Sequence, residues 1–155
     1  MPVHIRPYRD GDAPLLFRVF HASVHGLAPG FYSQQQLDAW APSDFAPQEW
    51  AARMDRLQPF VAEIDGRPVG YADVQADGFI DHFFVAAGAA RQGIGSLLLL
   101  RLQQQAAERG LSRLYADVSL AAEAFFGRHG FETMRRNTVT VRGTRFDNLR
   151  MCKIL

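Results

Sequence analysis

The spacing of hydrophobic residues changes along the chain, and these changes predict the order of the helices and strands. Apolar residues three and four positions apart are typical of one face of a helix, whereas short apolar runs between turn residues are typical of strands. In the first half we expect helices after Asp10 or Asp12, from Ser33 to Trp40 and over Pro47–Asp55. Strands are expected at Val3–Arg6, Phe60–Ile64, Val69–Val74 and Phe79–Val85.

The second half predicts a strand, helix, strand unit followed by a hairpin. A helix is expected over Gly93–Arg109, where apolar residues repeat every four positions before Gly110. Next come a strand at Leu114–Val118, a helix over residues 120–129, and strands at Glu132–Val141 and Arg145–Ile154. The unit from Phe79 to Val118 requires a right-handed crossover and a parallel strand pair. The predicted class is α+β (α/β), with a single mixed, mostly antiparallel central sheet and flanking helices.

Length and composition bound the size and the environment of the protein. A chain of 155 residues buries about 69% of its unfolded surface by the usual scaling, enough for one core, and we expect a single domain over residues 1–155. Apolar runs are much shorter than the roughly 20 residues of a membrane span. Arg6, Arg9, Asp10 and Asp12 stand where a signal peptide would be apolar, so a cytoplasmic location is expected.

The charge distribution argues against a broad anionic partner but leaves room for one local anion site. The formal net charge is +1, which predicts neither nucleic-acid nor membrane binding. From Arg128 onward, however, six arginines and Lys153 face only Glu132 and Asp147. Cys152 is the one cysteine, so no intrachain disulfide can form. The His21/His25 pair has no partnering acid, and no metal site is expected.

The loop from Arg91 to Ser96 carries the clearest chemistry. It places glycines at the start of the long helix, where free amides and the helix dipole attract phosphate. A tight turn is the alternative reading. The Lys of a P-loop is absent, and a dinucleotide fingerprint would need a third glycine where the chain has Leu98. Asp117, about 22 residues beyond Gly95, keeps dinucleotide binding open as an alternative.

Two segments together resemble the GNAT superfamily of N-acetyltransferases. The loop Ala90–Gly95 matches both glycines of the family pattern, although Ala90 stands where the family has Gln or Arg. A later segment is similar to the family pattern Asn-x-x-Ala-x-x-Phe-Tyr-x-x-x-Gly-Phe at Ser119, Ala122, Phe125, Phe126, Gly130 and Phe131. The resemblance extends from Ile5-Arg6-Pro7 over almost the whole chain and implies a GNAT-like acyl-CoA N-acyltransferase fold.

The resemblance implies acetyl-CoA as co-substrate and assigns residues to it. The pyrophosphate would lie on the amides of Gln92–Ser96, and the pantetheine arm along Phe83–Val85, with the Phe83 amide polarising the thioester carbonyl. Arg128 or Arg91 would meet the 3′-phosphate. The full set of expected cofactor-binding residues is Phe83, Phe84, Val85, Arg91, Gln92, Gly93, Ile94, Gly95, Ser96, Ser119, Phe126 and Arg128.

The catalytic groups are less conventional than the cofactor site. The family's usual acid is a Tyr, but this chain has Phe126 there, so Tyr115 is the substitute donor to consider. His82 is the favoured base because histidine titrates near neutral pH, and neighbouring Asp81 is the second candidate. Strand alternation places Asp81 and His82 on opposite faces.

The expected reaction is direct transfer of an acetyl group from acetyl-CoA to a primary amine of a small molecule or peptide. The N-terminal helices of the family carry acceptor specificity, which points here to His25, Tyr32 and Trp40. Family members are often dimers, so a homodimer is a further expectation. Two alternatives remain: a weak or inactive acyl-CoA-binding sensor, and a dinucleotide-binding protein that uses Asp117.

Overall fold

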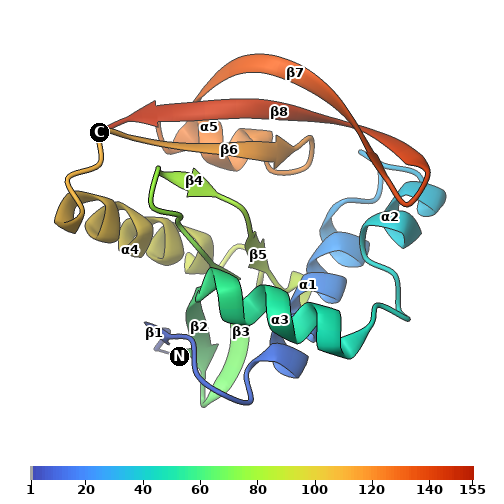
Figure 1. Cartoon of the computed structure of the whole chain (residues 1–155), viewed down its shortest axis with the longest axis horizontal. Coiled ribbons are helices and arrows are strands. Elements are labelled where there is room, and N and C mark those ends of the chain that lie inside the picture. Colours follow the sequence, from blue (N-terminus) through green and yellow to red (C-terminus); the bar gives the residue numbers. More distant parts are fainter. Residues whose placement is uncertain (1) are drawn as a thin grey trace.

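The computed structural model describes residues 2–155, which fold into two sheets with helices packed on and between them (Figure 1). The helices are α1 (Ala13–Leu27), α2 (Gln34–Trp40), α3 (Pro47–Leu57), the 3-10 turn η1 (Ala87–Ala89), α4 (Ile94–Glu108) and α5 (Glu123–Arg128). The strands are β1 (His4–Pro7), β2 (Phe60–Ile64), β3 (Arg67–Ala72), β4 (Phe79–Ile80), β5 (Phe83–Val85), β6 (Arg113–Ser119), β7 (Glu132–Val141) and β8 (Thr144–Ile154).

The expected α+β class is confirmed, but the strands form two sheets where the sequence predicts one. The first sheet has the order β1-β2-β3-β5, and the second has the order β4-β6-β8-β7. The expected parallel pair is present, because β4 and β6 run parallel on either side of the α4 crossover. Figure 1 shows the second sheet as a separate layer over the first, with α4 beside the junction.

The predicted continuous strand Phe79–Val85 is interrupted at Asp81 and His82. Its first part pairs with β6 and its second part pairs with β3, so one short segment belongs to both sheets in turn. The amide of Asp73 donates to the His82 carbonyl at 3.1 Å, while the amide of His82 donates to the Asp73 carboxylate at 2.6 Å. A side chain thus replaces a main-chain acceptor at the point where the strand changes partner.

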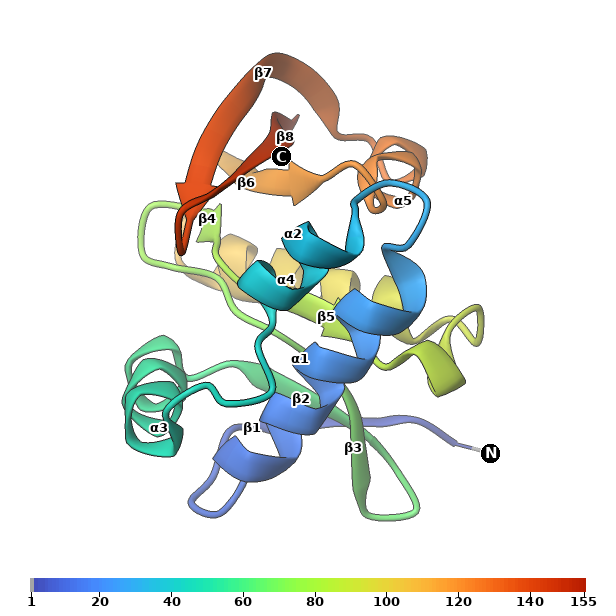
Figure 2. The same ribbon diagram turned by 90° about the vertical axis from the view of Figure 1, so that its right-hand side faces the viewer.

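Strand alternation in the first sheet separates two hydrophobic cores. Val61 and Tyr71 face α1 and α3, whereas Ala62 and Ala72 face α4. Alanines and Gly70 on the α4 face let the helix approach closely, since a Cβ at Gly70 would lie 3.2 Å from side-chain carbons of Ile94 and Leu98. Figure 2 shows α1 in front of the first sheet and α4 behind it. The sheet is therefore held rigidly from both sides.

The predicted N-cap residues of α1 and α2 behave differently in the structure. Ser33 and Gln36 form a reciprocal capping box at the start of α2, as the predicted N-cap requires. Asp12 occupies the N-cap position of α1, but its carboxylate binds Arg6 and makes no cap hydrogen bond to the helix. Between residues 2 and 155, no helix combines the length and apolarity needed to cross a membrane.

Candidate functional site

The edge of β5 that faces β6 is free. β5 pairs with β3 along one edge, and within residues 2–155 no strand pairs with the other. Hydrogen bonds join Asp73 to His82 and Val69 to Ala86, and bonded pairs alternate along an antiparallel ladder. Phe84 therefore directs its amide and carbonyl toward β3, while Phe83 and Val85 direct theirs into the gap. This edge can accept an extended ligand as an added strand.

A narrow cavity of about 60 Å³ lies in the gap between β5 and β6. The segments around Ile80–Phe84 form one wall, and those around Ala116–Ser119 form the other. Its lining residues are Trp40, Ile80, Asp81, Phe83, Phe84, Ala116, Asp117, Val118, Ser119, Ala122 and Phe126. The dimensions suit a thin, extended group rather than a ring system.

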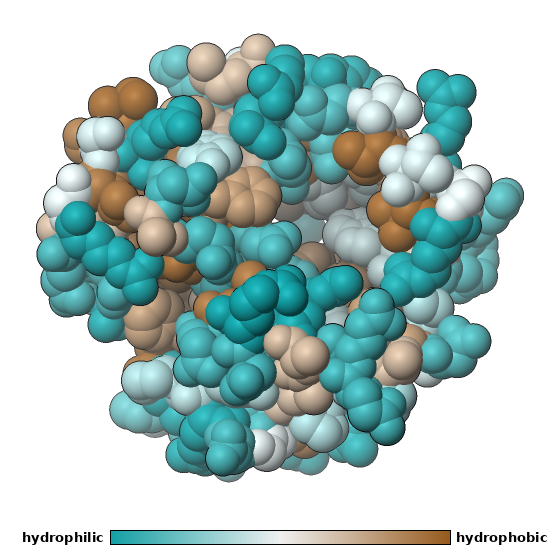
Figure 3. All heavy atoms as spheres, in the orientation of Figure 1, coloured by the Kyte–Doolittle hydropathy of each residue, from teal (hydrophilic) through white to brown (hydrophobic). Residues whose placement is uncertain are grey.

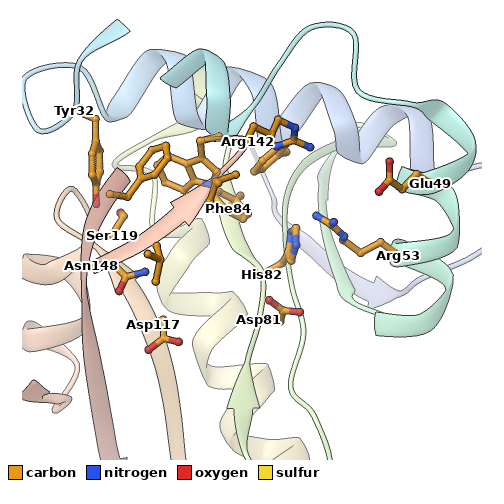
Figure 4. Close-up of a pocket in the computed structure, with 15 residues that line it drawn as sticks. Tyr32, Glu49, Arg53, Asp81, His82, Phe84, Asp117, Ser119, Arg142 and Asn148 are labelled. Carbon is orange, nitrogen blue, oxygen red and sulfur yellow. The ribbon is translucent and has the colours of Figure 1, made fainter. Parts of the chain in front are cut away.

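A second, larger cavity of about 630 Å³ opens beside the first, and the space-filling view is hollowed near its centre (Figure 3). Its walls combine aromatic rings with charged groups: Phe20, Tyr32, Trp40, Glu49, Arg53, Asp81, His82, Phe84, Asp117, Ser119, Val139, Val141, Arg142, Phe146 and Asn148. Figure 4 shows Asp117, Ser119 and Asn148 on one side of this cavity and Asp81, His82 and Arg53 on the other. Trp40, Asp81, Phe84, Asp117 and Ser119 line both cavities, so the two meet there.

The glycine loop before α4 has the geometry of an anion site. Gly93 has φ +79° at the start of the helix, a conformation that side-chain-bearing residues rarely adopt, and Arg91 also has a positive φ of 63°. The first-turn amides of α4 are left without partners inside the helix. Gly95 has a different reason to be glycine, because a Cβ there would lie 3.0 Å from the ring of Phe125.

Comparisons with known proteins agree with this geometry. The sequence model of the acetyltransferase (GNAT) domain matches residues 30–153. The chain belongs to the GNAT family. An N-acetyltransferase of Escherichia coli strain K12, YafP, which is itself uncharacterised, is 35% identical over 149 residues, or 96% of this chain and 94% of the relative. This membership makes the protein an acetyl-CoA-dependent N-acetyltransferase.

Solved GNAT structures share the fold over the full length. A GCN5-related N-acetyltransferase from Rhodopseudomonas palustris is 32% identical, with a TM-score of 0.95 over 100% of this chain and 97% of its own. The PaiA N-acetyltransferase of Thermoplasma acidophilum, solved in complex with coenzyme A, has a TM-score of 0.81 over 100% of both chains at 17% identity. The second likeness shows the fold alone.

Ser96 and His129 connect the glycine loop of this GNAT protein to α5. His129 Nδ1 lies 2.9 Å from the carbonyl of Phe125, which can only accept, so Nδ1 carries a proton. In the neutral ring Nε2 then accepts from the Ser96 hydroxyl at 3.0 Å. The expected phosphate ligand Ser96 thus has a partner within the protein, and its contribution to a ligand would require exchange of this bond. Arg91 and Arg128, the candidates for the 3′-phosphate, are exposed.

Phe126 lies in the gap of the acetyltransferase, where the resemblance predicts it. Its side chain is 3% exposed and packs against Phe83 and Phe131, with ring centroids 5.3 and 5.0 Å apart. Phe125 completes this aromatic cluster. The cluster holds no hydroxyl, so the position of the usual acid is apolar.

His82, the favoured base, lies at the cavity but is buried. Its Nδ1 is 3.0 Å from the Tyr71 hydroxyl, and its ring packs among Phe20, Trp50 and Phe84. Burial, reinforced by the positive charge of the arginines on α3, lowers the pKa of His82 to about 3. The imidazole is neutral at physiological pH and is a much weaker base than a free histidine.

The two carboxylates at the junction of the cavities differ in their surroundings. Asp117 binds the Arg150 guanidinium at 2.6 Å and the Asn137 amide at 3.1 Å. The Asp81 side chain makes no hydrogen bond within residues 2–155, and burial raises its pKa despite the nearby Arg53. The pKa of Asp73 behind it is raised to about 6, again by burial. Of the two carboxylates at the junction, Asp81 is therefore the one whose side chain has no protein partner within the described residues.

Two of the residues expected from the sequence lie elsewhere. The Tyr115 hydroxyl, expected as a substitute acid, donates to Asp77 in the turn before β4, and Tyr115 lines neither cavity. His25, expected near the acceptor, donates from Nε2 to the Ala41 carbonyl at 2.8 Å, stacks on His21 and lines neither cavity. Both side chains form hydrogen bonds with residues distant in the sequence, which the hydrophobic pattern does not predict.

Tyr32 and Trp40, the other two residues expected near the acceptor, line the larger cavity. The Tyr32 hydroxyl donates to the Asp147 carbonyl at 2.6 Å and accepts from the Leu120 amide at 3.0 Å. Its burial raises its pKa. Tyr32 therefore joins the segment before α2 to β8, and its ring forms a fixed wall. Trp40 packs edge-on against Tyr32 and Phe84.

Four charged or polar cavity residues were missed by sequence reasoning: Glu49, Arg53, Arg142 and Asn148. Arg53 and Glu49 come from α3 and Asn148 from β8, whereas Arg142 lies in the turn between β7 and β8. No motif links these segments. The excess of arginine from Arg128 onward is the one feature of the sequence that indicates positive charge near this cavity, and it does not single out Arg142.

Proposed function

We propose that the protein transfers an acetyl group directly from acetyl-CoA to the primary amine of a small acceptor, with both substrates bound together. The observation that carries this proposal is the meeting of the two cavities at the free edge of β5. A thin cavity suits the pantetheine arm, and the larger one suits an acceptor. Homologous complexes support the donor, since a Salmonella typhimurium structure contains acetyl-CoA and the PaiA structure contains coenzyme A.

The free edge of β5 would hold and activate the thioester. The Phe83 and Val85 main-chain groups would pair with the amides of pantetheine, as in an added strand. An amide aimed at the thioester oxygen stabilises the negative charge that grows as the amine attacks. The glycine loop and the first-turn amides of α4 would hold the pyrophosphate.

Asp81 would receive the proton of the attacking nitrogen. The amine becomes strongly acidic once it bonds to the carbonyl carbon, so a carboxylate with a raised pKa is a sufficient base. His82, neutral and bonded to Tyr71, would shape the site beside it. The coenzyme A thiolate would leave without a tyrosine acid, because Phe126 supplies no proton.

A covalent acyl-enzyme has no support in the cavities. Cys152 is half-buried in β8 and lines neither of them. Initial rates with varied acetyl-CoA and amine should therefore give intersecting double-reciprocal lines, and Cys152→Ser should retain activity. Parallel lines would contradict direct transfer.

Thermal unfolding with acetyl-CoA, followed by thiol release with an amine panel, tests the proposal. A ligand at 100 times its dissociation constant should stabilise the protein by about 2.7 kcal/mol. Asp81→Asn should lower kcat at least tenfold and keep the acetyl-CoA shift in Tm, whereas Tyr115→Phe, outside both cavities, should retain kcat. Binding without thiol release would favour the sensor alternative, and absence of a Tm shift would overturn the proposal.

A further inference from the structure

The larger cavity contains a guanidinium without a carboxylate partner. Within residues 2–155 the ion pairs are Arg6–Asp12, Arg6–Glu63, Arg136–Asp147 and Arg150–Asp117, and Arg53 takes part in none. Glu49 precedes Arg53 by four residues on α3, a spacing at which opposite charges on a helix usually meet. In Figure 4 the Arg53 side chain instead extends from α3 toward His82 and the cavity. The half-buried guanidinium of Arg53 forms no ion pair with Glu49 and lines the cavity, so it is placed to bind an anion.

A second guanidinium strengthens the positive charge on the same rim. The Arg142 and Arg53 guanidinium carbons lie 4.9 and 5.3 Å from the ring centroid of Phe45. Arg142 also donates to the Ala39 carbonyl at 2.8 Å, which fixes it near α2. Two like charges that share one aromatic ring repel each other, and an anionic group on the ligand would relieve that repulsion.

The opposite wall offers acceptors for a positive group. The side-chain oxygen of Asn148 is buried and has no hydrogen-bond partner within residues 2–155. Figure 4 shows it above Asp117, across the cavity from Asp81 and Arg53. This buried oxygen is closed to a ligand, and the exposed carboxylate of Asp117 is the acceptor that this wall presents to the cavity. Carboxylates from both walls, Asp81 and Asp117, thus lie at the junction of the two cavities, and the guanidiniums of Arg53 and Arg142 lie at the rim of the larger one.

We propose that the acceptor is a zwitterionic small molecule, an amine that carries its own carboxylate on an apolar body, with the carboxylate bound by Arg53. The inference rests on the proposed function, since it names the acceptor of the same site. The ammonium lies toward Asp81 and Asp117, where the two cavities meet. The aromatic walls formed by Phe20, Trp40 and Phe84 bury the apolar body. Aromatic α-amino acids are the simplest molecules with all three features.

Matched amines with and without a carboxylate test this assignment. The pairs are phenylalanine with phenethylamine, and 4-(aminomethyl)benzoate with benzylamine. Binding is followed by tryptophan fluorescence in the presence of saturating coenzyme A, because Trp40 lines the cavity, and turnover is followed by thiol release with acetyl-CoA. We expect the carboxylated member of at least one pair to bind at least tenfold more tightly and to show the higher kcat/KM.

Substitution of Arg53 shows whether that preference comes from the guanidinium. Arg53→Gln should weaken binding of the carboxylated amine at least tenfold and affect its uncharged partner far less, and Arg53→Lys should restore part of the preference. Arg56→Gln is the matched control, because Arg56 is an exposed residue on the same helix that lines neither cavity. It should keep the wild-type preference.

The outcomes separate this inference from the proposed function. Equal or weaker binding of the carboxylated member in both pairs overturns the inference whether or not turnover is seen, and so does a preference that survives Arg53→Gln. If amines without a carboxylate are acetylated at the same rate as their carboxylated partners, the proposed transfer reaction stands but the inference about Arg53 fails. If acetyl-CoA supports no turnover while Arg53-dependent binding is present, the cavity assignment stands and the transfer reaction fails.

Discussion

The carboxylate of Asp73 accepts a hydrogen bond from the main-chain amide of His82 at 2.6 Å, at the residue where the chain passes from one sheet to the other. Asp73 is 1% exposed, and a second bond from the Gln75 side chain holds its other oxygen. The bond replaces a ladder hydrogen bond with a side chain at the end of the pairing between β3 and β5. We expect the cavity between β5 and β6 to depend on this bond, because it fixes the chain at the point where the two strands diverge.

Loss of the Asp73 carboxylate should close or loosen the gap. Asp73→Ala leaves the His82 amide buried without an acceptor, which costs about 1–3 kcal/mol of the free energy of unfolding. We expect acetyl-CoA affinity to fall at least tenfold. Asp73→Asn keeps an acceptor oxygen and is the control, with affinity within about threefold of wild type. Calorimetric titration measures both, and equal affinity in Asp73→Ala would show that the gap has another support.

The buried groups beside the gap predict a pH dependence of stability. The pKa of His82 is about 3 in the folded protein and about 6.5 when unfolded, so between these values only the unfolded chain binds the proton. This group therefore removes stability as pH falls from 6.5 to 3, by at most about 1.4 kcal/mol per pH unit. His82→Asn should flatten this loss in urea unfolding measured at several pH values. An unchanged slope would contradict the burial argument.

Asp73 should act in the opposite direction over part of the same range. Its folded pKa of about 6 lies above the unfolded value of 3.8, so the folded protein binds the proton more tightly. Its contribution to stability falls as pH rises from about 4 to about 6. The same urea series on Asp73→Asn should show a gain relative to wild type that grows with pH across this window. A difference independent of pH would count against the raised pKa.

Gly95 should be required for packing as well as for the loop. A Cβ would lie 3.0–3.1 Å from Phe125, and the larger Gly95→Val side chain should cost about 1–3 kcal/mol of stability through overpacking. Truncation of the neighbour in Gly95→Val/Phe125→Ala should recover part of that loss, as a double-mutant cycle in urea would show. Strict additivity would indicate that the two residues do not press on each other.

The ion pair of Arg6 with Asp12 should be a separate determinant of stability. Two hydrogen bonds of 2.8 and 2.9 Å join the side chains, which are 10% and 4% exposed, and Glu63 binds the same guanidinium. Burial opposes the Asp12 charge, but the bonds from Arg6 and the Arg9 amide lower its pKa overall. Asp12→Ala should cost about 3–5 kcal/mol because it leaves a buried positive charge. Arg150→Ala, at the exposed pair with Asp117, is the comparison and should cost much less.

Features that depend on neighbours in the sequence were predictable. The helix α4 lies within one residue of its predicted limits at both ends, because a four-residue apolar repeat, the loop glycines and Gly110 are all local signals. The capping box at Ser33 is also a local signal. The parallel pair of β4 with β6 follows from the order strand, helix, strand along the chain. The family resemblance, carried by short motifs at residues 90–95 and 119–131, is confirmed.

Features that depend on distant partners were decided by the tertiary structure. The segment Phe79–Val85 is typical of one strand, but it is interrupted where the His82 amide donates to the Asp73 carboxylate, and its two parts join different sheets. Tyr115 and His25 have suitable chemistry, yet Asp77 and the Ala41 carbonyl hold them away from the cavities. Arg53 enters the cavity from a helix without any motif. Periodicity specifies which face of an element is buried, whereas a site is formed by side chains that meet only after distant segments pack together.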